Sequence, residues 1–402
     1  MASSSAALAG GYLIPNESPR ELAMAQSAMA NQTGADALFM NTAALAGQDG
    51  LDVSLGAELL LNRTDWSDPS LGSASLKPKA NTPPTATVSY GRHMSNGMAW
   101  GAGVGVNVPA GGGLNWPAGW PGQEYVQTVS QQVFAIGAGA AIQPTPFLKL
   151  GVGYLRFQAT EELHQSINYL DHYGDAGIVA SGGANGVMGA IEFDVPQIPL
   201  VLAATYVHSS DLDMSGDAHF TQVPTAFQPL LHDQGVTETL IIPDVFYVGA
   251  AYEVMPNLKV SAAYDFERWS PYKEDKFVGS GGFSVSVPRD YKNAYVFRVG
   301  AEWANTPFLP ALTLRVGGLR SISPQPTETL SPSLTDGDST AFCLGAGYNV
   351  KSNLRIDAGW QHAFFDSISA KMGSDAFPGT YKTTVDLVSV GINWRSDLGM
   401  TR

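Results

Sequence analysis

The stretch Leu354-Arg355-Ile356-Asp357-Ala358-Gly359-Trp360-Gln361 alternates strictly between two kinds of side chain. Leucine, isoleucine, alanine and tryptophan occupy one set of positions, and arginine, aspartate, glycine and glutamine occupy the other. Successive side chains of a β-strand point to opposite faces, so this pattern predicts a strand with one apolar and one polar face. Residues 258–267 and 295–303 alternate in the same way. A soluble sandwich also has such strands, so alternation alone does not fix the fold.

The lengths of the connections decide between the two folds. Predicted strands lie at 51–63, 84–92, 98–107, 129–142, 147–163, 185–195, 200–210, 243–254, 257–269, 293–303, 311–321, 340–350, 353–366 and 383–394. Their links are alternately short and long; the long ones lie near 65–83, 108–128, 164–184, 211–242, 270–292, 322–339 and 367–382. Short periplasmic turns and long outer loops are typical of outer-membrane barrels. We therefore predict an all-β protein, a 14-stranded antiparallel transmembrane β-barrel.

The composition agrees with a wall that faces lipid. Charged residues make up 14% of the 402 residues, against about 25% in typical soluble domains. No apolar run reaches the roughly 18–20 residues of a membrane-spanning helix. The net charge of −14 argues against a nucleic-acid partner. The single cysteine, Cys343, excludes an intramolecular disulfide, and we predict a packed side chain, with neither cofactor nor metal.

The N-terminal part differs from the rest. Residues 1–9 end in Ala7-Leu8-Ala9, which has the form of a cleavage site, and we predict a residual leader there. Residues 10–48 contain the capping box Ser18-Pro19-Arg20-Glu21, which predicts a helix to about Ala30, with a second short helix within 33–41. Helices next to a barrel can be buried in its lumen, so we predict a hatch; a periplasmic tail is the alternative. The barrel then spans 49–394, followed by a tail at 395–402.

Three features of the predicted barrel bear on function. Alternation points four charged side chains into the lumen: Arg298, Glu302, Arg315 and Asp357. The third strand carries glycines that predict a kink or, equally, room for the lumen: Gly101, Gly103 and Gly105. The outer loops contain large apolar residues that predict a binding surface, or loops packed on each other: Leu114, Trp116, Trp120, Phe220, Phe227 and Leu230.

Several ordered motifs together resemble the FadL/TodX family of outer-membrane channels for fatty acids and aromatic hydrocarbons. They are Gly11-Tyr12-Leu13, Asn41-Thr42-Ala43, Met98-Ala99-Trp100-Gly101-Ala102, Ile242-Pro243-Asp244 with Val248–Tyr252, Trp269-Ser270, Leu344–Tyr348 and Asn353-Leu354. Thr42 stands where the family has proline, so the bend in the hatch at Asn41 and Thr42 is expected to differ.

The resemblance implies a function and a route. It implies passive uptake of long-chain fatty acids or aromatic or alkane hydrocarbons, without catalysis. The ligand would meet a groove in the outer loops, enter a pocket reached by Leu13, Ile14 and Pro15, and leave sideways beside the third strand. Trp100 and the three glycines would form this lateral gate. The resemblance further implies a monomer in the bacterial outer membrane, surrounded by lipid and lipopolysaccharide.

The substrate and two rival functions stay open at this stage. Glu161-Glu162 would repel a carboxylate, which favours neutral hydrophobic compounds without excluding fatty acids. The inward charges would also suit a general porin for polar solutes. A lipid hydrolase is less well supported, because the chain has no G-x-S-x-G motif. Asp336-Gly337-Asp338 fits a turn better than a Ca²⁺ loop.

Overall fold

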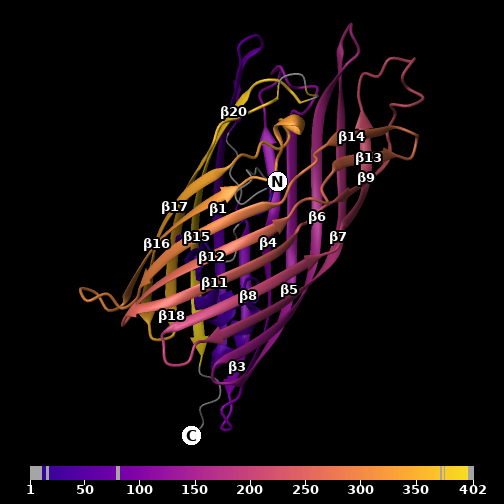
Figure 1. Cartoon of the computed structure of the whole chain (residues 1–402). Coiled ribbons are helices and arrows are strands. Elements are labelled where there is room, and N and C mark those ends of the chain that lie inside the picture. Colours follow the sequence, from indigo (N-terminus) through magenta and orange to yellow (C-terminus); the bar gives the residue numbers. More distant parts are fainter. Residues whose placement is uncertain (1–10, 15–17, 78–81, 372–373, 375, 397–402) are drawn as a thin grey trace.

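The fold is a closed antiparallel barrel, seen in a computed structural model that describes residues 11–14, 18–77, 82–371, 374 and 376–396 (Figure 1). Within these residues, fourteen strands form the wall: β1 (Gly50–Asp68), β3 (Pro84–His93), β4 (Ala99–Asn115), β5 (Thr128–Thr145), β6 (Leu148–Asn168), β7 (Tyr173–Asp194), β8 (Leu200–Ser209), β11 (Asp244–Met255), β12 (Leu258–Arg268), β15 (Ala294–Trp303), β16 (Leu312–Ile322), β17 (Ser339–Lys351), β18 (Leu354–Phe365) and β20 (Thr380–Ser396). Each pairs with the next around the ring, and β1 closes it on β20, from Leu51↔Ser396 to Ser67↔Thr380. The predicted fold is confirmed.

The outer loops hold the remaining strands. They are β2 (Gly72–Ser75), β9 (Leu212–Phe220), β10 (Gln234–Leu240), β13 (Glu274–Gly279), β14 (Ser284–Pro288) and β19 (Ile368–Ser369), together with the short helix η4 (Thr327–Thr329). β9 pairs with both β7 and β10, and β10 continues to β13, so these loops extend the wall outward. The prediction of a long loop at 164–184 is wrong, because β6 continues to Asn168 and β7 begins at Tyr173.

Strands β6 and β7 show why this loop was mistaken. They pair continuously from Leu148↔Phe193 to Asn168↔Tyr173. At about 3.3 Å per residue such strands are roughly 70 Å long, far more than a bilayer requires. Residues 174–186 contain many glycines and alanines, which weaken the apolar alternation on which the prediction depended.

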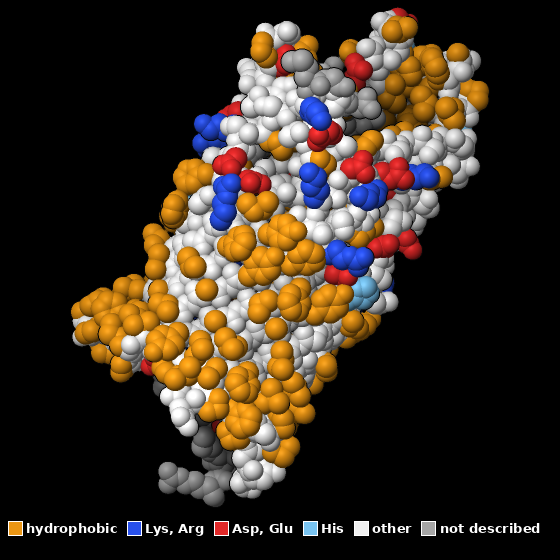
Figure 2. Space-filling model, in the orientation of Figure 1, with side chains coloured by type: hydrophobic (Ala, Val, Ile, Leu, Met, Phe, Trp, Pro, Cys, Tyr) orange, Lys and Arg blue, Asp and Glu red, His pale blue; other side chains and the backbone are white. Residues whose placement is uncertain are grey.

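The outer face of the barrel carries an apolar band. Exposed side chains include Val104, Ile136, Val299 and Val390, and Val152 keeps 66% of its surface accessible. Figure 2 shows this band around the middle and lower part of the molecule, with charged residues above it. Large exposed apolar areas mark surfaces that meet another apolar phase. The band therefore places these strands in lipid.

The hatch lies inside the barrel. It consists of α1 (Pro19–Ala23), η1 (Ser27–Asn31), η2 (Gly34–Leu38) and η3 (Thr42–Gly47), which are almost entirely buried. Ser18 caps α1 by accepting a hydrogen bond from the Glu21 amide, so the predicted start is confirmed. The helix ends at Ala23 rather than near Ala30, because Ala25 and Gln26 adopt the left-handed conformation. In the part of the chain described, no helix is long and apolar enough to cross a membrane.

The other predicted boundaries differ slightly or lie outside the described residues. The first barrel strand begins at Gly50, and β20 reaches Ser396, so it includes the first two residues of the predicted tail. The predicted leader at 1–9 lies outside the described residues, and so does Pro15.

Candidate functional site

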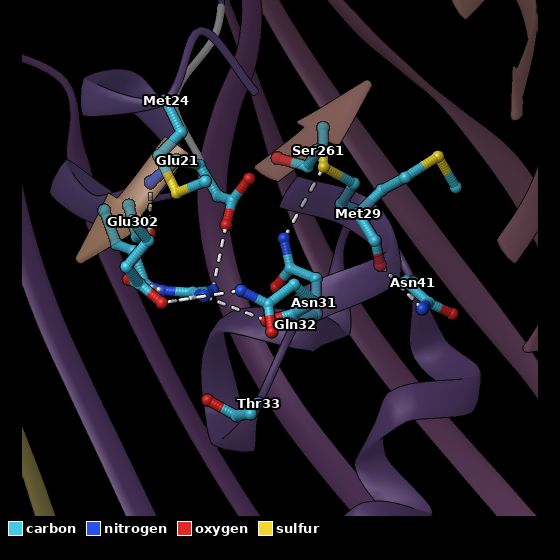
Figure 3. Close-up of polar contacts among 12 residues, drawn as sticks. Glu21, Met24, Met29, Asn31, Gln32, Thr33, Asn41, Ser261 and Glu302 are labelled. Carbon is cyan, nitrogen blue, oxygen red and sulfur yellow. Dashed lines mark hydrogen bonds and ion pairs between the residues drawn. The ribbon is translucent and has the colours of Figure 1, made fainter. Parts of the chain in front are cut away.

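Buried ion pairs fix the hatch to one side of the barrel. The guanidinium of Arg20, on α1, donates to both carboxylate oxygens of Glu302 on β15, at 2.9 and 3.0 Å (Figure 3). Arg315 on β16 donates to Glu302 and to Asp357, each at 2.8 Å. Asn31 from η1 also points at Glu302. These charges are paired and buried, so they hold the hatch in place.

The same wall carries a second buried pair. Arg298 on β15 donates to Asp265 on β12 and to the Ala25 carbonyl of the hatch. The four lumen charges predicted from alternation therefore do point inward. Arg20 is part of the predicted capping box, but no partner was predicted for it, although it is the only lysine or arginine among the first 62 residues, a signal of a specific ion pair.

The opposite wall receives the hatch through close packing. A Cβ on Gly101 of β4 would lie 2.0 Å from the Leu45 carbonyl oxygen, and one on Gly151 of β6 would lie 2.4 Å from the Ala43 nitrogen. Asn41, fully buried, donates to Glu192 on β7, which also binds Lys149. Thr42 begins η3 and donates to the Leu38 carbonyl. Backbone of the hatch thus rests directly against the wall.

Strand β4 contains an irregularity above the hatch. Its pairing with β3 runs from His93↔Ala99 to Ala86↔Val106, and its pairing with β5 shifts register between Asn107 and Ala110. Val108 and Pro109 therefore lie opposite the single residue Phe134, so β4 holds one extra residue here, and proline has no N–H to offer a neighbouring strand. Gly101, Gly103 and Gly105 pair regularly on both sides. The kink predicted at these glycines is corrected to Val108-Pro109, and Gly101 instead gives room to the hatch.

The N-terminal segment pairs with this irregular part of β4. Leu13 bridges Ala110, the Ile14 amide donates to the Pro109 carbonyl at 2.8 Å, and the Gly111 amide donates to the Tyr12 carbonyl at 2.9 Å. The Gly11 amide donates to the carboxylate of Asp336, 2.9 Å away. Residues 11–14 thus act as a short inner strand along β4.

An inner cavity lies between the hatch and β4. Leu13 and Ile14 form part of its wall. Most of the other lining residues are apolar, and a few polar ones lie beside them: Phe39, Met40, Pro109, Ala135, Leu155, Phe157, Val207, Ile242, Pro243, Val245, Gln26, Asn107, Tyr247, Glu267 and Arg298. The cavity therefore adjoins both the hatch and the irregular part of β4.

An outer cavity opens toward the loops. Tyr12 and Leu114 line it, together with residues of β5, β6, β10, β13 and the loop before β17. Since Tyr12 lines the outer cavity whereas Leu13 and Ile14 line the inner one, residues 12–14 lie between the two. This segment is the partition between the cavities.

The other predicted lining residues lie elsewhere in the outer loops. Trp116 and Trp120 stack at 4.3 Å in a closed cluster with Trp66 and Phe377, and they are 2% and 3% exposed. Phe220 packs on Phe283. Phe227 and Leu230 are half exposed near the tip of the β6–β7 hairpin. The structure therefore brings only Leu114 of this group to the outer cavity.

Three further residues singled out in the sequence lie outside the two cavities. Trp100 faces outward on β4 beside the ring of Tyr90. Cys343 is buried, and its thiol donates to Gln361. Asp336, in the predicted turn, accepts hydrogen bonds from Gly11 and from Ser323. The described residues contain no cluster of side chains arranged to hold a metal ion.

Comparison with known proteins places these features in a family. Residues 1–395 match the family model described as "Outer membrane protein transport protein (OMPP1/FadL/TodX)". A 47 kDa outer membrane protein of Pasteurella multocida is 25% identical over 205 residues, 48% of this chain and 46% of that protein. The match thus spans about half the length of this curated relative.

Solved structures share the fold. A FadL homologue from Pseudomonas aeruginosa has a TM-score of 0.84 at 16% identity, covering 96% of this chain and 99% of that one. The toluene transporter TbuX of Ralstonia pickettii has a TM-score of 0.68 at 18% identity, covering 94% and 98%. The toluene transporter TodX of P. putida has a TM-score of 0.70 at 15% identity, covering 90% and 94%.

Proposed function

The chain belongs to the OMPP1/FadL/TodX family of outer membrane transport proteins, and from this premise we propose that it is a passive channel for hydrophobic small molecules. The observation that carries the proposal is the pair of cavities separated by residues 12–14 above a fixed hatch. Two structural neighbours are toluene transporters by name, which supports aromatic hydrocarbons as one ligand class.

The proposed route runs sideways rather than through the hatch. A ligand enters the outer cavity from the loops, passes the partition at Tyr12–Ile14, and occupies the inner cavity. It leaves beside Val108-Pro109, where β4 is out of register with β5 and no longer pairs with β3. A sideways exit lets a hydrophobic ligand pass into the apolar band of the membrane without crossing water. The apolar outer face supports contact with lipid at this point.

A general porin is less well supported. A water-filled pore needs a lumen open along its length and charges free to meet solutes. Here Arg298, Arg315, Glu302 and Asp357 are engaged in ion pairs with one another, the hatch and Asp265. We therefore assign these charges to holding the hatch and not to selecting polar solutes.

A reversible cross-link tests the route. Leu13→Cys with Ala110→Cys, in a Cys343→Ser background, places two thiols on a bridged antiparallel pair, a spacing that suits a disulfide. We expect oxidation to lower accumulation of radiolabelled toluene by cells carrying the channel, by about tenfold, and reduction to restore it. The two single-cysteine variants are the controls.

The same experiment can overturn the route. Unchanged toluene accumulation in a fully cross-linked channel would show that ligands do not pass the partition. Ion conductance of the purified protein adds a second readout, since large steady currents would favour the porin.

A further inference from the structure

The outer cavity contains more acidic than basic side chains. Glu161, Glu238 and Asp275 line it, and the basic residues there are Arg289 and Lys276. Arg289 is partly engaged: it donates to Asp275 at 2.7 Å and to Ser333 at 2.8 Å, while its buried Nη1 has no hydrogen-bond partner among the described residues. Lys276 lies exposed at the rim. Asp275 and Arg289 thus neutralise each other, and two carboxyl groups remain.

Within the described residues, neither Glu161 nor Glu238 forms a salt bridge, although burial raises the pKa of the Glu161 carboxyl and the charge of Arg289 partly offsets this rise. Glu161 is 8% exposed, and one of its oxygens accepts from the Gln131 amide at 3.2 Å. In the described part of the chain, the other carboxyl oxygen of Glu161 accepts no hydrogen bond. Neither carboxyl oxygen of Glu238 accepts one from a described residue. Burial, followed by repulsion from Glu161 and Asp275, raises the pKa of the Glu238 carboxyl to about 10. The cavity is therefore short of a positive charge.

The remaining walls are aromatic and apolar. Tyr12 lies edge-on to Tyr272, with ring centroids 6.1 Å apart, and both rings line the cavity. Leu114, Leu163 and Leu240 complete the apolar part. Aromatic faces attract ammonium groups, and apolar walls bind a hydrocarbon body. One cavity thus offers carboxylate acceptors together with a surface for a hydrophobic group.

The approach to the cavity has the same electrostatic character. The sequence contains no lysine or arginine between Arg156 and Lys259, the segment that forms the outward hairpin of β6 and β7 and strands β9 and β10. Surface charge of one sign raises the local concentration of ligands of the opposite sign over about a Debye length. Cations therefore meet less repulsion than carboxylates at this entrance.

We propose that the outer cavity selects hydrophobic amines, whose ammonium group is bound by Glu161 and Glu238, over carboxylates of the same size. This inference rests on the proposed function and names a substrate class for it. An alcohol can donate one hydrogen bond without charge, so it binds with intermediate strength. A carboxylate meets two acidic side chains, and the charge of Arg289 is already compensated by Asp275, although one of its nitrogens, Nη1, has no hydrogen-bond partner among the described residues.

Three ligands with one carbon skeleton test the proposal: 2-phenylethylamine, 2-phenylethanol and phenylacetate. Titration calorimetry of the full chain in lipid nanodiscs gives their dissociation constants. We expect the amine to bind at least about tenfold more tightly than phenylacetate. The double variant Glu161→Gln, Glu238→Gln should weaken amine binding by about tenfold and leave the alcohol within about twofold.

Glu162→Gln is the matched control, because this neighbouring glutamate is exposed on the opposite face of β6. Heat-modifiable gel mobility confirms that each variant folds, and the two single variants serve if the double variant does not. Equal or tighter binding of phenylacetate, or unchanged amine binding in a folded double variant, would overturn the inference. Toluene has no polar group, so its accumulation by cells tests the channel function independently of amine selection. If cells with the channel accumulate toluene but amines are not preferred, only the amine inference fails. If they do not accumulate toluene, both the channel function and the amine inference fail.

Discussion

The hatch is held differently on its two sides. On the β15–β18 wall, Arg20 and Arg315 share Glu302 in a buried charged network. On the β3–β4 wall, the described contacts are neutral: Gln48 hydrogen-bonds Ser89, and Gly101 leaves room for the Leu45 carbonyl. Removing one member of a buried ion pair costs about 3–5 kcal/mol, whereas a neutral hydrogen bond contributes about 1 kcal/mol net.

This difference indicates which side of the hatch can move at the lower energetic cost. The hatch is bound most strongly far from Val108-Pro109 and least strongly beside β4, the strand that carries the irregularity. The Leu13 bridge lies on the same side. Movement that opens the partition therefore need not break the charged network, and a ligand can pass while the lumen stays closed.

Breaking the charged side should have the largest effect. Glu302→Ala leaves Arg20 and Arg315 buried without their shared carboxylate, which we expect to cost about 3–5 kcal/mol and to loosen the hatch. Single-channel recording should show new steady ion currents. Glu162→Ala, an exposed site, is the control. A closed channel with unchanged thermal stability in the Glu302 variant would contradict the role given to the network.

Crowding the neutral side should have a smaller effect. The side chain of Gly101→Val would meet the Leu45 carbonyl, whose oxygen lies 2.0 Å from the new Cβ. Overpacking of this kind costs about 1–3 kcal/mol. We expect intermittent rather than steady currents, because Arg20 still holds the far side. Gly189→Val is matched, since a Cβ there has no atom within 4 Å. Equal behaviour of the two valine variants would argue against tight packing at Gly101.

The sequence predicted the wall better than the contacts inside it. Period-two alternation showed that Glu302 and Asp357 point inward, because orientation depends only on local geometry. The partner of Glu302 lies 282 residues away, and no local pattern encodes that pairing. Likewise, Trp116 and Trp120 looked like ligand contacts, but in the fold they meet other loops.

The irregularity of β4 could have been placed more accurately. The glycines at 101, 103 and 105 suggested weak pairing, yet glycine fits a regular strand when another backbone lies close by. Pro109 was the better signal, since a residue without an N–H cannot complete a ladder on both sides. Only the structure shows that the N-terminal segment pairs there instead.

The smallest expected effect concerns the third attachment, between Gly11 and Asp336. Burial raises the pKa of the Asp336 carboxyl to about 7 from 3.8. The hydrogen bond from the Gly11 amide lowers this pKa, so docking of residues 11–14 favours the ionised carboxylate; docking strengthens as the pH rises through about 7 and weakens below it. In Asp336→Asn, the amide oxygen can still accept from Gly11, without this pH dependence. With Leu13→Cys in a Cys343→Ser background, we expect thiol labelling to be similar in both proteins at pH 4 and roughly a few-fold slower with Asp336 at pH 8. The ratio of the two labelling rates does not depend on the thiol's own ionisation, which is common to both proteins. A ratio that does not change with pH would show that Asp336 does not control the partition.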